Sequence, residues 1–213
     1  MPRQRPFLIT GFEPFGGAER NPSMHIAEAL DGAEIAGQPI TSLTLPVVFG
    51  ESLKRLDQAI RRLRPIGVIA LGVATTRSVI SIERIAINID DARIADNAGQ
   101  QPIDQAIIRH APAAYFSQLP IKAIHQALQQ AGIPSEISQS AGTYVCNHVF
   151  FGLMHRLRLQ RRIPAGFLHI PPELDVDELH GLPLPRMIEA VRLAITTTLS
   201  YAEDIRLSAG RED

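Results

Sequence analysis

Short apolar runs that alternate with segments of helical spacing constrain the fold of this chain more than any other feature. Residues 66–71 form a continuous apolar run between Pro65 and Gly72, which is typical of a strand buried on both faces. Residues 51–63, just before it, carry Leu and Ile three and four positions apart, which predicts an amphipathic helix. Strands that alternate with helices in this way form a mostly parallel sheet.

The same alternation runs along most of the chain. Strands are predicted over residues 6–10, 41–48, 66–71, 79–88, 136–140 and 165–170, and helices over residues 22–30, 51–63, 121–130, 146–160 and 185–201. We see no internal repeat and no linker in the 213 residues. We therefore expect one domain over residues 1–213, an α/β fold of three layers, α/β/α, around a mostly parallel, twisted central sheet.

One long segment does not fit the alternation. Between residues 90 and 120, Gly99 and several prolines and glutamines interrupt any period. So long an irregular stretch in a compact domain is either functional or disordered. We expect this one to be functional.

Charge and cysteine content exclude several classes of protein. The 21 Lys and Arg balance the 22 Asp and Glu, so no bulk charge is available to bind nucleic acid or an acidic membrane. The apolar runs are too short to span a bilayer, and the first ten residues contain too short an apolar stretch for a signal peptide. A single cysteine excludes an intrachain disulfide and a cysteine-rich zinc site. We expect a cytoplasmic protein without a metal or other cofactor.

That cysteine, Cys146, is the first candidate for chemistry. It follows a predicted strand and the turn at residues 141–143, and it begins a predicted helix. A helix N-terminus favours a thiolate, so the position predicts a thiol with a lowered pKa. A small residue packed under the helix explains the same position, and the residues alone leave both interpretations open.

A thiol nucleophile needs a base, and the chain offers seven histidines: His25, His110, His125, His148, His155, His169 and His180. His148 lies two residues beyond Cys146 on the same helix, so the two side chains diverge. His25 and His125 lie in helices expected at the surface. His169 ends a predicted strand before two prolines, which places it on the same rim of the sheet as Cys146.

The base in turn needs an acceptor that fixes its tautomer, and Glu83 lies inside an apolar strand. A carboxylate in such a strand requires a partner. A Glu83 on the solvent face of an edge strand, or one paired with Arg84, explains the residue equally well.

The loop at residues 11–17 follows the first strand and is rich in glycine, but it lacks the spacing of a phosphate-binding loop. Phe12 and Phe15 on this loop suit a small, flat, mostly apolar ligand. Packing of either ring in the core remains open.

Three blocks of sequence resemble the pyroglutamyl peptidase I family, also called pyrrolidone-carboxylate peptidase. They read TGFEPFGG with NPS (residues 10–17 and 21–23), SIERIAIN with DARI and DN (81–88, 91–94, 96–97), and SAGTYVCN with GFLHIP (140–147 and 166–171). Weaker similarity extends over most of the chain.

The resemblance implies a cysteine peptidase with Cys146 as nucleophile, His169 as general base and acid, and Glu83 as the residue that orients His169. It also implies a pocket for the pyrrolidone ring, in which Phe12 and Phe15 sandwich the ring. The further wall would be Val47, Ile94, Tyr144 and Val145, with Arg93 near the thiolate or oxyanion.

Two departures from the family pattern stand near this pocket. Val73 occupies a position where some members carry a Gln that can hydrogen-bond the lactam. Thr75 and Thr76 replace a glycine-rich turn, which makes the turn stiffer and bulkier.

By the same resemblance, the expected substrates are peptides with an N-terminal pyroglutamate, and the expected assembly is a homo-oligomer, a dimer or tetramer. Two other functions remain open. One is a cysteine hydrolase of another small amide, and the other is a non-catalytic binding protein that retains the fold.

Overall fold

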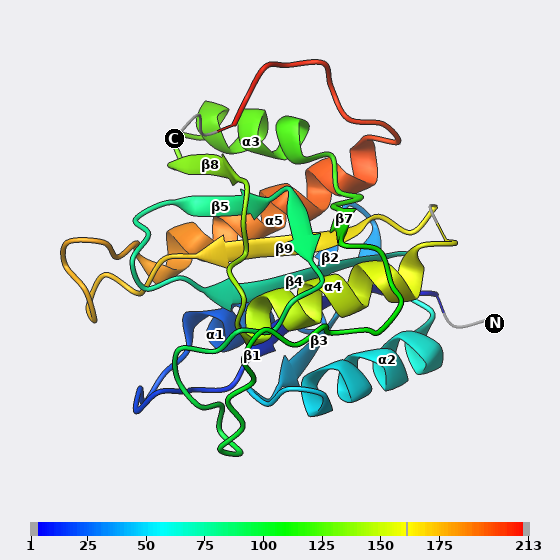
Figure 1. Ribbon diagram of the computed structural model, residues 1–213. Helices are drawn as coiled ribbons and strands as arrows, with labels where there is room; N and C mark the ends of the chain where they lie inside the picture. Colours follow the sequence, from blue (N-terminus) through cyan, green and yellow to red (C-terminus); the bar gives the residue numbers. More distant parts are fainter. Residues whose placement is uncertain (1–3, 161, 211–213) are drawn as a thin grey trace.

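The computed structural model describes residues 4–160 and 162–210, and it shows a seven-stranded sheet with helices on both faces (Figure 1). The strands are β1 (Phe7–Phe12), β2 (Glu34–Ile35), β3 (Gln38–Leu45), β4 (Gly67–Val73), β5 (Ile80–Glu83), β6 (Ile85–Ile87), β7 (Ala114–Phe116), β8 (Ser135–Ser138) and β9 (Ala165–Ile170). The helices are α1 (Pro22–Leu30), α2 (Glu51–Leu63), α3 (Ile121–Gln130), α4 (Val145–Leu157) and α5 (Leu184–Ser200). In space the main sheet runs β2-β3-β1-β4-β9-β5-β8, and β6 pairs with β7 in a second sheet.

The predicted α/β fold with a mostly parallel sheet is confirmed. Helices α1, α2 and α3 and strand β9 have the predicted bounds, and α4 and α5 differ by one to three residues. The short strands β2 and β7 were not predicted, because two or three residues carry too little periodicity to be recognised. The expected single domain over residues 1–213 stays a prediction, since residues 1–3, 161 and 211–213 lie outside the described part.

The prediction of one continuous strand over residues 79–88 is wrong. The segment changes partner at Arg84, whose N–H donates to Ser138 of β8 while its carbonyl accepts from Ser117 next to β7. Strand β5 therefore belongs to the main sheet, and β6 leaves it to pair with β7. The isoleucines stand at even positions up to Ile82 and at odd positions from Ile85, so the alternation changes phase at this point, which the prediction of one strand overlooked.

Strand β5, which lies between β9 and the edge strand β8, runs against one of its neighbours. Strands β1, β3, β4 and β9 are parallel, but β5 is antiparallel to β9, with Ser81 opposite His169. Glu83 lies two residues beyond Ser81 and so emerges on the same face, diagonally across from His169. This reversal brings the two predicted site residues together.

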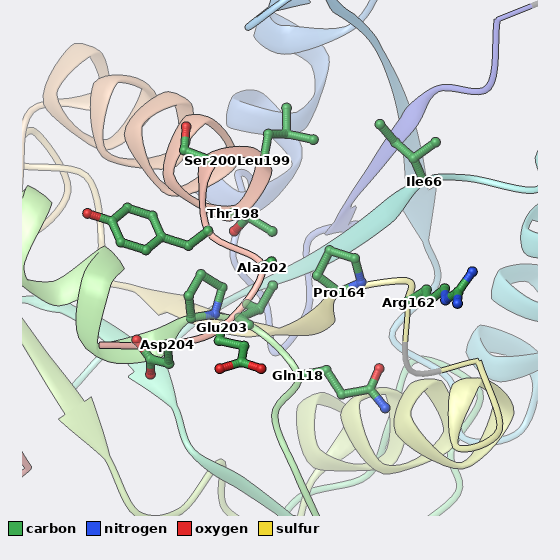
Figure 2. A pocket seen from close by; sticks show the side chains of 13 residues that line it. Ile66, Gln118, Arg162, Pro164, Thr198, Leu199, Ser200, Ala202, Glu203 and Asp204 are labelled. Atoms are coloured by element: carbon green, nitrogen blue, oxygen red, sulfur yellow. The ribbon is translucent and has the colours of Figure 1, made fainter. Parts of the chain in front are cut away.

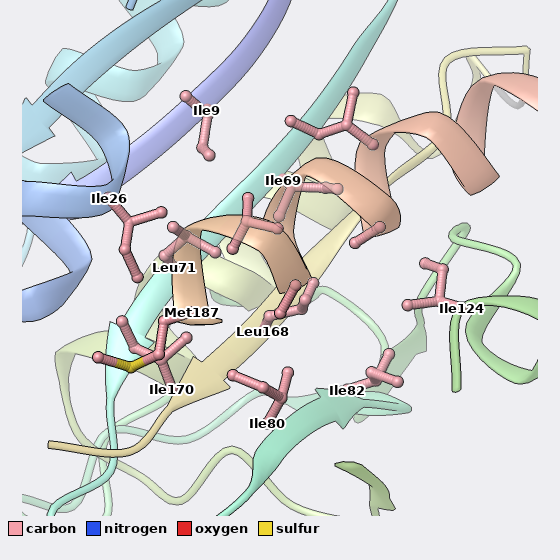
Figure 3. Close-up of a cluster of buried hydrophobic side chains, with 14 of the residues drawn as sticks. Ile9, Ile26, Ile69, Leu71, Ile80, Ile82, Ile124, Leu168, Ile170 and Met187 are labelled. Atoms are coloured by element: carbon pink, nitrogen blue, oxygen red, sulfur yellow. The ribbon is translucent and has the colours of Figure 1, made fainter. Parts of the chain in front are cut away.

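Two apolar cores cover the two faces of the sheet. On one face, Ile69, Leu71, Leu168 and Ile170 pack against α1, α3 and α5, as Figure 3 shows for Ile26, Ile124 and Met187. On the other face, Ala70 and Phe167 pack against α2 and α4. The alternate residues of β4 and β9 thus divide between two cores, which accounts for the unbroken apolar runs in the sequence.

The junction of β1 and α1 fixes the start of the loop at residues 13–17. Asn21 caps α1 by accepting from the Ser23 N–H at 3.1 Å, and Pro22 occupies the first turn. Ser23 Oγ accepts from the Phe12 N–H at 2.9 Å. A Cβ on Gly11 would lie 2.1 Å from the Ser23 carbonyl oxygen, so this close approach requires glycine.

Candidate active site

Glu83 and His169 form a buried pair in the centre of the sheet. His169 Nδ1 lies 2.7 Å from Glu83 Oε1, and the glutamate side chain is 0% exposed. An ionised carboxylate only accepts hydrogen bonds, so Nδ1 carries the proton and Nε2 keeps a free lone pair. The alternative pairing of Glu83 with Arg84 is excluded, because Arg84 donates to the Ala209 carbonyl instead.

Cys146 lies beside this pair, at the N-terminus of α4. Gly72 of β4 is the register partner of His169, and a Cβ on Gly72 would lie 2.7 Å from the Cys146 sulfur. The sulfur therefore rests on the backbone of β4, next to the strand that carries His169. Helix α4 begins at Tyr144 without a side-chain cap, so its first N–H groups are not occupied by a capping side chain. No hydrogen bond joins Cys146 to His169 in the described part of the chain, and their direct contact stays a prediction.

The predicted lowering of the thiol pKa is wrong for the resting state. Burial raises the pKa of Cys146 from 9.0 to about 12, and the Glu83 carboxylate acts in the same direction, while the Arg77 guanidinium opposes both. Desolvation and a nearby negative charge outweigh the partial positive charge of the helix N-terminus. Cys146 as a whole residue is nevertheless partly exposed, so water offsets some of this cost. The thiol is protonated at neutral pH and has to lose its proton when it attacks.

Alkylation tests this raised pKa. We expect iodoacetamide to modify Cys146 slowly at about pH 7 and faster at each step up to about pH 10, because the thiolate fraction grows tenfold per unit below the pKa. The label reports one site only, since the chain has one cysteine. The urea-unfolded chain is the control, and its thiol, with an ordinary pKa, should react faster at about pH 8. A labelling rate that levels off near neutral pH in the folded protein would show a preformed thiolate instead.

Four of the predicted pocket residues gather near the start of α4. The rings of Phe15 and Tyr144 lie 6.1 Å apart between centroids, and both side chains are partly exposed. Phe12 and Val47 are almost fully buried in the core on the α2 and α4 face. Phe15 and Tyr144 thus offer ring surface at the site, whereas Phe12 belongs to the core in this state.

The other four predicted pocket residues differ in how far they are exposed to solvent. Val73 ends β4 and is partly buried, and Val145 is buried in the core next to Cys146. Arg93 is exposed, as is Ile94 with 48% of its surface accessible. Within residues 4–160 and 162–210 the Arg93 side chain makes no hydrogen bond with Cys146, so its role near the thiolate stays a prediction.

The irregular segment after residue 90 is ordered by polar contacts that the sequence did not reveal. Asp96 Oδ2 accepts from the Phe49 N–H at 2.9 Å, and Asn97 Nδ2 donates to Glu13 Oε1 at 3.0 Å. The Tyr144 hydroxyl donates to the Ala95 carbonyl at 3.1 Å. The segment is thereby attached to three loops around Cys146, which supports the interpretation of this stretch as functional rather than disordered.

Five of the other six histidines, namely His25, His125, His148, His155 and His180, have other partners. His148 is excluded as the base, as helix geometry predicted: its Nδ1 lies 2.8 Å from Asp90 Oδ2, and its Nε2 accepts from the Gly50 N–H at 3.0 Å. His25 pairs with Glu173 at 2.7 Å. These contacts connect loops and helices, and they leave His169 as the histidine beside Cys146.

A pocket lies away from the predicted site residues, between the end of α5 and the start of β9 (Figure 2). It has a volume of about 580 Å³ and is lined by Gln118, Arg162 and Asp204 among others. Asp204 already accepts from the N–H groups of Lys122 and Ala123 at the start of α3. No group of three or more His, Cys, Asp or Glu placed to hold a metal ion is found among the residues that the structure describes.

The sequence and the fold both match one family. The model of the family described as pyroglutamyl peptidase matches residues 5–201. A pyrrolidone-carboxylate peptidase of Yersinia pestis (strain Pestoides F) is 47% identical over 211 residues, which cover 97% of this chain and 98% of the relative.

Solved structures agree. Pyroglutamyl peptidase I from Bacillus amyloliquefaciens superposes with a TM-score of 0.91 at 40% identity, covering 97% of this chain and all of that one (100%). The pyrrolidone carboxyl peptidase from Thermococcus litoralis gives a TM-score of 0.92 at 39% identity, covering 96% of this chain and 100% of that one. The resemblance of the three sequence blocks is thereby confirmed, and the chain belongs to the pyroglutamyl peptidase family.

Proposed function

We propose that this protein is a cysteine peptidase that removes an N-terminal pyroglutamyl residue from peptides, with Cys146, His169 and Glu83 as its catalytic set. One observation carries the proposal: a buried Glu83–His169 pair lies beside a partly exposed cysteine at a helix N-terminus. Membership of the pyroglutamyl peptidase family supplies the substrate class. The arrangement serves acyl transfer through a thioester.

The reaction begins with a proton transfer, because the resting thiol is neutral. Cys146 attacks the pyroglutamyl carbonyl as its proton passes to His169 Nε2, the nitrogen that the bond to Glu83 leaves free. Glu83 stabilises the imidazolium that forms. His169 then gives this proton to the leaving amine, and the thioester remains on Cys146. Water hydrolyses the thioester with His169 as base, which restores the thiol.

The start of α4 supplies the electrostatic component. The N–H groups of the first helical turn have no intrahelical acceptor, and the Cys146 N–H is among them. A donor at this point stabilises the negative oxygen that develops on the scissile carbonyl.

Specificity follows from the uncharged ligand. A pyroglutamyl residue is a lactam without a free amine, so it can bind against the partly exposed rings of Phe15 and Tyr144 without losing the hydration of a charge. An ordinary N-terminal ammonium would lose that hydration and bind poorly.

A panel of aminocoumarin amides tests the proposed function. The purified protein should release the fluorophore from the pyroglutamyl amide and leave the prolyl and alanyl amides intact, with no loss of rate in the presence of chelators. Cleavage of only the prolyl or alanyl amide would assign another small amide as substrate. Cleavage of none would favour a binding protein.

Gly72 provides a further prediction. We expect Gly72→Ala to lower kcat about 10- to 100-fold, because a displacement of the nucleophile by about 1 Å costs a factor of this order. The added Cβ would meet the Cys146 sulfur at 2.7 Å and the Phe167 ring at 2.8 Å. Gly152→Ala, whose Cβ would meet the flexible end of Leu53, is the matched control for overpacking without contact to the sulfur. Equal losses of kcat in both variants would contradict the placement of the sulfur on Gly72.

Assembly and location are supported less directly. The homo-oligomer, a dimer or tetramer, rests on the family resemblance, and light scattering of the purified protein tests it. The proposed cytoplasmic location rests on the single cysteine, which fits a reducing compartment. Among the described residues, no helix has the length and apolar character needed to cross a membrane.

A further inference from the structure

Arg77 contacts the proposed catalytic set from the turn that contains Thr75 and Thr76. It follows β4, and its N–H closes the turn by donating to the Ala74 carbonyl at 3.0 Å. The guanidinium then makes two contacts of different kinds. Nη1 donates to Glu83 Oε1 at 2.7 Å, and Nη2 donates to the Ser140 carbonyl at 2.9 Å.

The first contact balances a buried charge. Within the part of the chain that the structure describes, Arg77 and His169 both donate to Glu83 Oε1, while Oε2 is buried and has no hydrogen-bond partner there. A buried carboxylate needs a compensating positive charge, and a neutral imidazole does not supply one. Arg77 supplies it, so that His169 does not have to be protonated for Glu83 to stay ionised.

The charges around Glu83 come from few elements. Strand β9 contributes His169, the turn after β4 contributes Arg77, and α4 places Cys146 close enough for both charges to act on its thiol. Strand β8 contributes the neutral Ser138 opposite Glu83. Arg77 is therefore the cation that faces this set in the described part of the chain.

The second contact reaches the segment that delivers the nucleophile. Ser140 lies between β8 and the start of α4, and its carbonyl also accepts from the Ser138 hydroxyl at 3.1 Å. One planar guanidinium thus joins Glu83 to the chain leading to Cys146. The flat, forked geometry of Arg suits two acceptors at a fixed angle, which a Lys ammonium does not reproduce.

We propose that Arg77 is a positioning residue of the active site, which keeps Glu83 ionised beside a neutral His169. It also holds the chain at Ser140, just before α4, in a fixed position relative to Glu83. This inference rests on the proposed peptidase function. This role goes beyond stabilising the turn, because the positive charge of Arg77 also influences the protonation of the catalytic groups.

The test compares pH profiles of kcat/KM on the pyroglutamyl aminocoumarin amide for the wild type, Arg77→Met and Arg77→Lys. Loss of a cation favours the protonated form of every neighbouring group, so both limbs of the Arg77→Met profile should move to higher pH by about half a unit or more. We expect kcat at the optimum to fall about 10- to 100-fold, with KM changed less than about threefold, because Arg77 orients Glu83 rather than the substrate. Arg77→Lys should keep the limbs in place but lower kcat about tenfold, because it retains the charge and loses the fork.

Arg186→Met is the matched control. Arg186 likewise joins a carboxylate, that of Glu189, to backbone carbonyls, those of Ala131 and Gly132, but none of these is a predicted site residue. This variant should keep the limbs of the wild-type pH profile and the wild-type kcat even where its Tm falls.

Because the Arg77 side chain is 25% exposed, guanidinium ions added at millimolar concentration should restore part of the activity of Arg77→Ala.

The outcomes distinguish a failure of the proposed peptidase function from a failure of the proposed role of Arg77. A wild type that does not cleave the pyroglutamyl amide overturns the proposed function itself. A wild type that cleaves, with Arg77→Met limbs at wild-type positions, overturns only the role of Arg77. If Arg77→Met does not fold, the Arg77→Lys variant tests the role of Arg77 instead. A wild-type kcat of Arg77→Lys together with a lowered Tm would mean that Arg77 only stabilises the fold.

Discussion

Cys146→Ala is expected to lower kcat/KM on the pyroglutamyl aminocoumarin amide by about 10⁴-fold or more, because it removes the atom that forms the thioester. A residual rate above that in water should remain, since the pocket and the helix N-terminus still bind and polarise the substrate. The chain has no second cysteine that could replace the lost nucleophile.

The fold of this variant should be unaffected. The substitution removes a single heavy atom from a partly exposed side chain, and Gly72 next to it has no side chain that loses packing. The Tm should therefore stay within a few degrees of the wild-type value, and free pyroglutamate should still bind. Activity above about 1% of the wild type in this folded variant would exclude Cys146 as the nucleophile.

Glu83→Gln is expected to lower kcat about 10²- to 10⁴-fold, by analogy with the loss of the orienting carboxylate in other nucleophile–histidine–acid sets. A neutral amide cannot stabilise the imidazolium that forms when Cys146 loses its proton. Its NH₂ group would also occupy the buried place of Oε2 or face the two donors, His169 and Arg77. The measurement is kcat and KM on the same substrate across the pH range.

Glu173→Gln is the matched control for this change. Glu173 is buried and accepts from a histidine, His25, at the same distance of 2.7 Å, but it is not bonded to any of the three proposed catalytic residues. We expect its kcat to stay within about threefold of the wild type. A Glu83→Gln variant that matches Glu173→Gln in kcat would show that Glu83 does not act through His169.

Much of the fold and the three catalytic candidates could be predicted from local sequence. The helical spacing of residues 51–63 and the cap at Asn21 are local signals, because each depends on residues only a few positions apart. Helices α1 and α2 therefore have their predicted bounds. His169 was identified because the end of a strand is a local feature. The resemblance to the family then chose between interpretations that the residues alone left open for Cys146 and Glu83.

The rest depends on contacts between residues distant in the sequence. The partners on either side of Arg84 are Ser117 and Ser138, and the phase shift between Ile82 and Ile85 marks the break without saying which strands are paired. The raised pKa of Cys146 arises from burial and from Glu83, which is 63 positions earlier in the chain, whereas the helix N-terminus alone suggested the opposite sign. Arg77 was not singled out for the same reason, because its two acceptors come from β5 and from the segment before α4.

The most direct test of the central claim is acid-quenched mass spectrometry of the wild type during turnover of an activated pyroglutamyl ester. The account predicts that one pyroglutamyl group is attached to the peptide that contains Cys146, through a thioester that hydroxylamine removes. A pyroglutamyl group on any other residue, or turnover in which Cys146 never carries one, would contradict it.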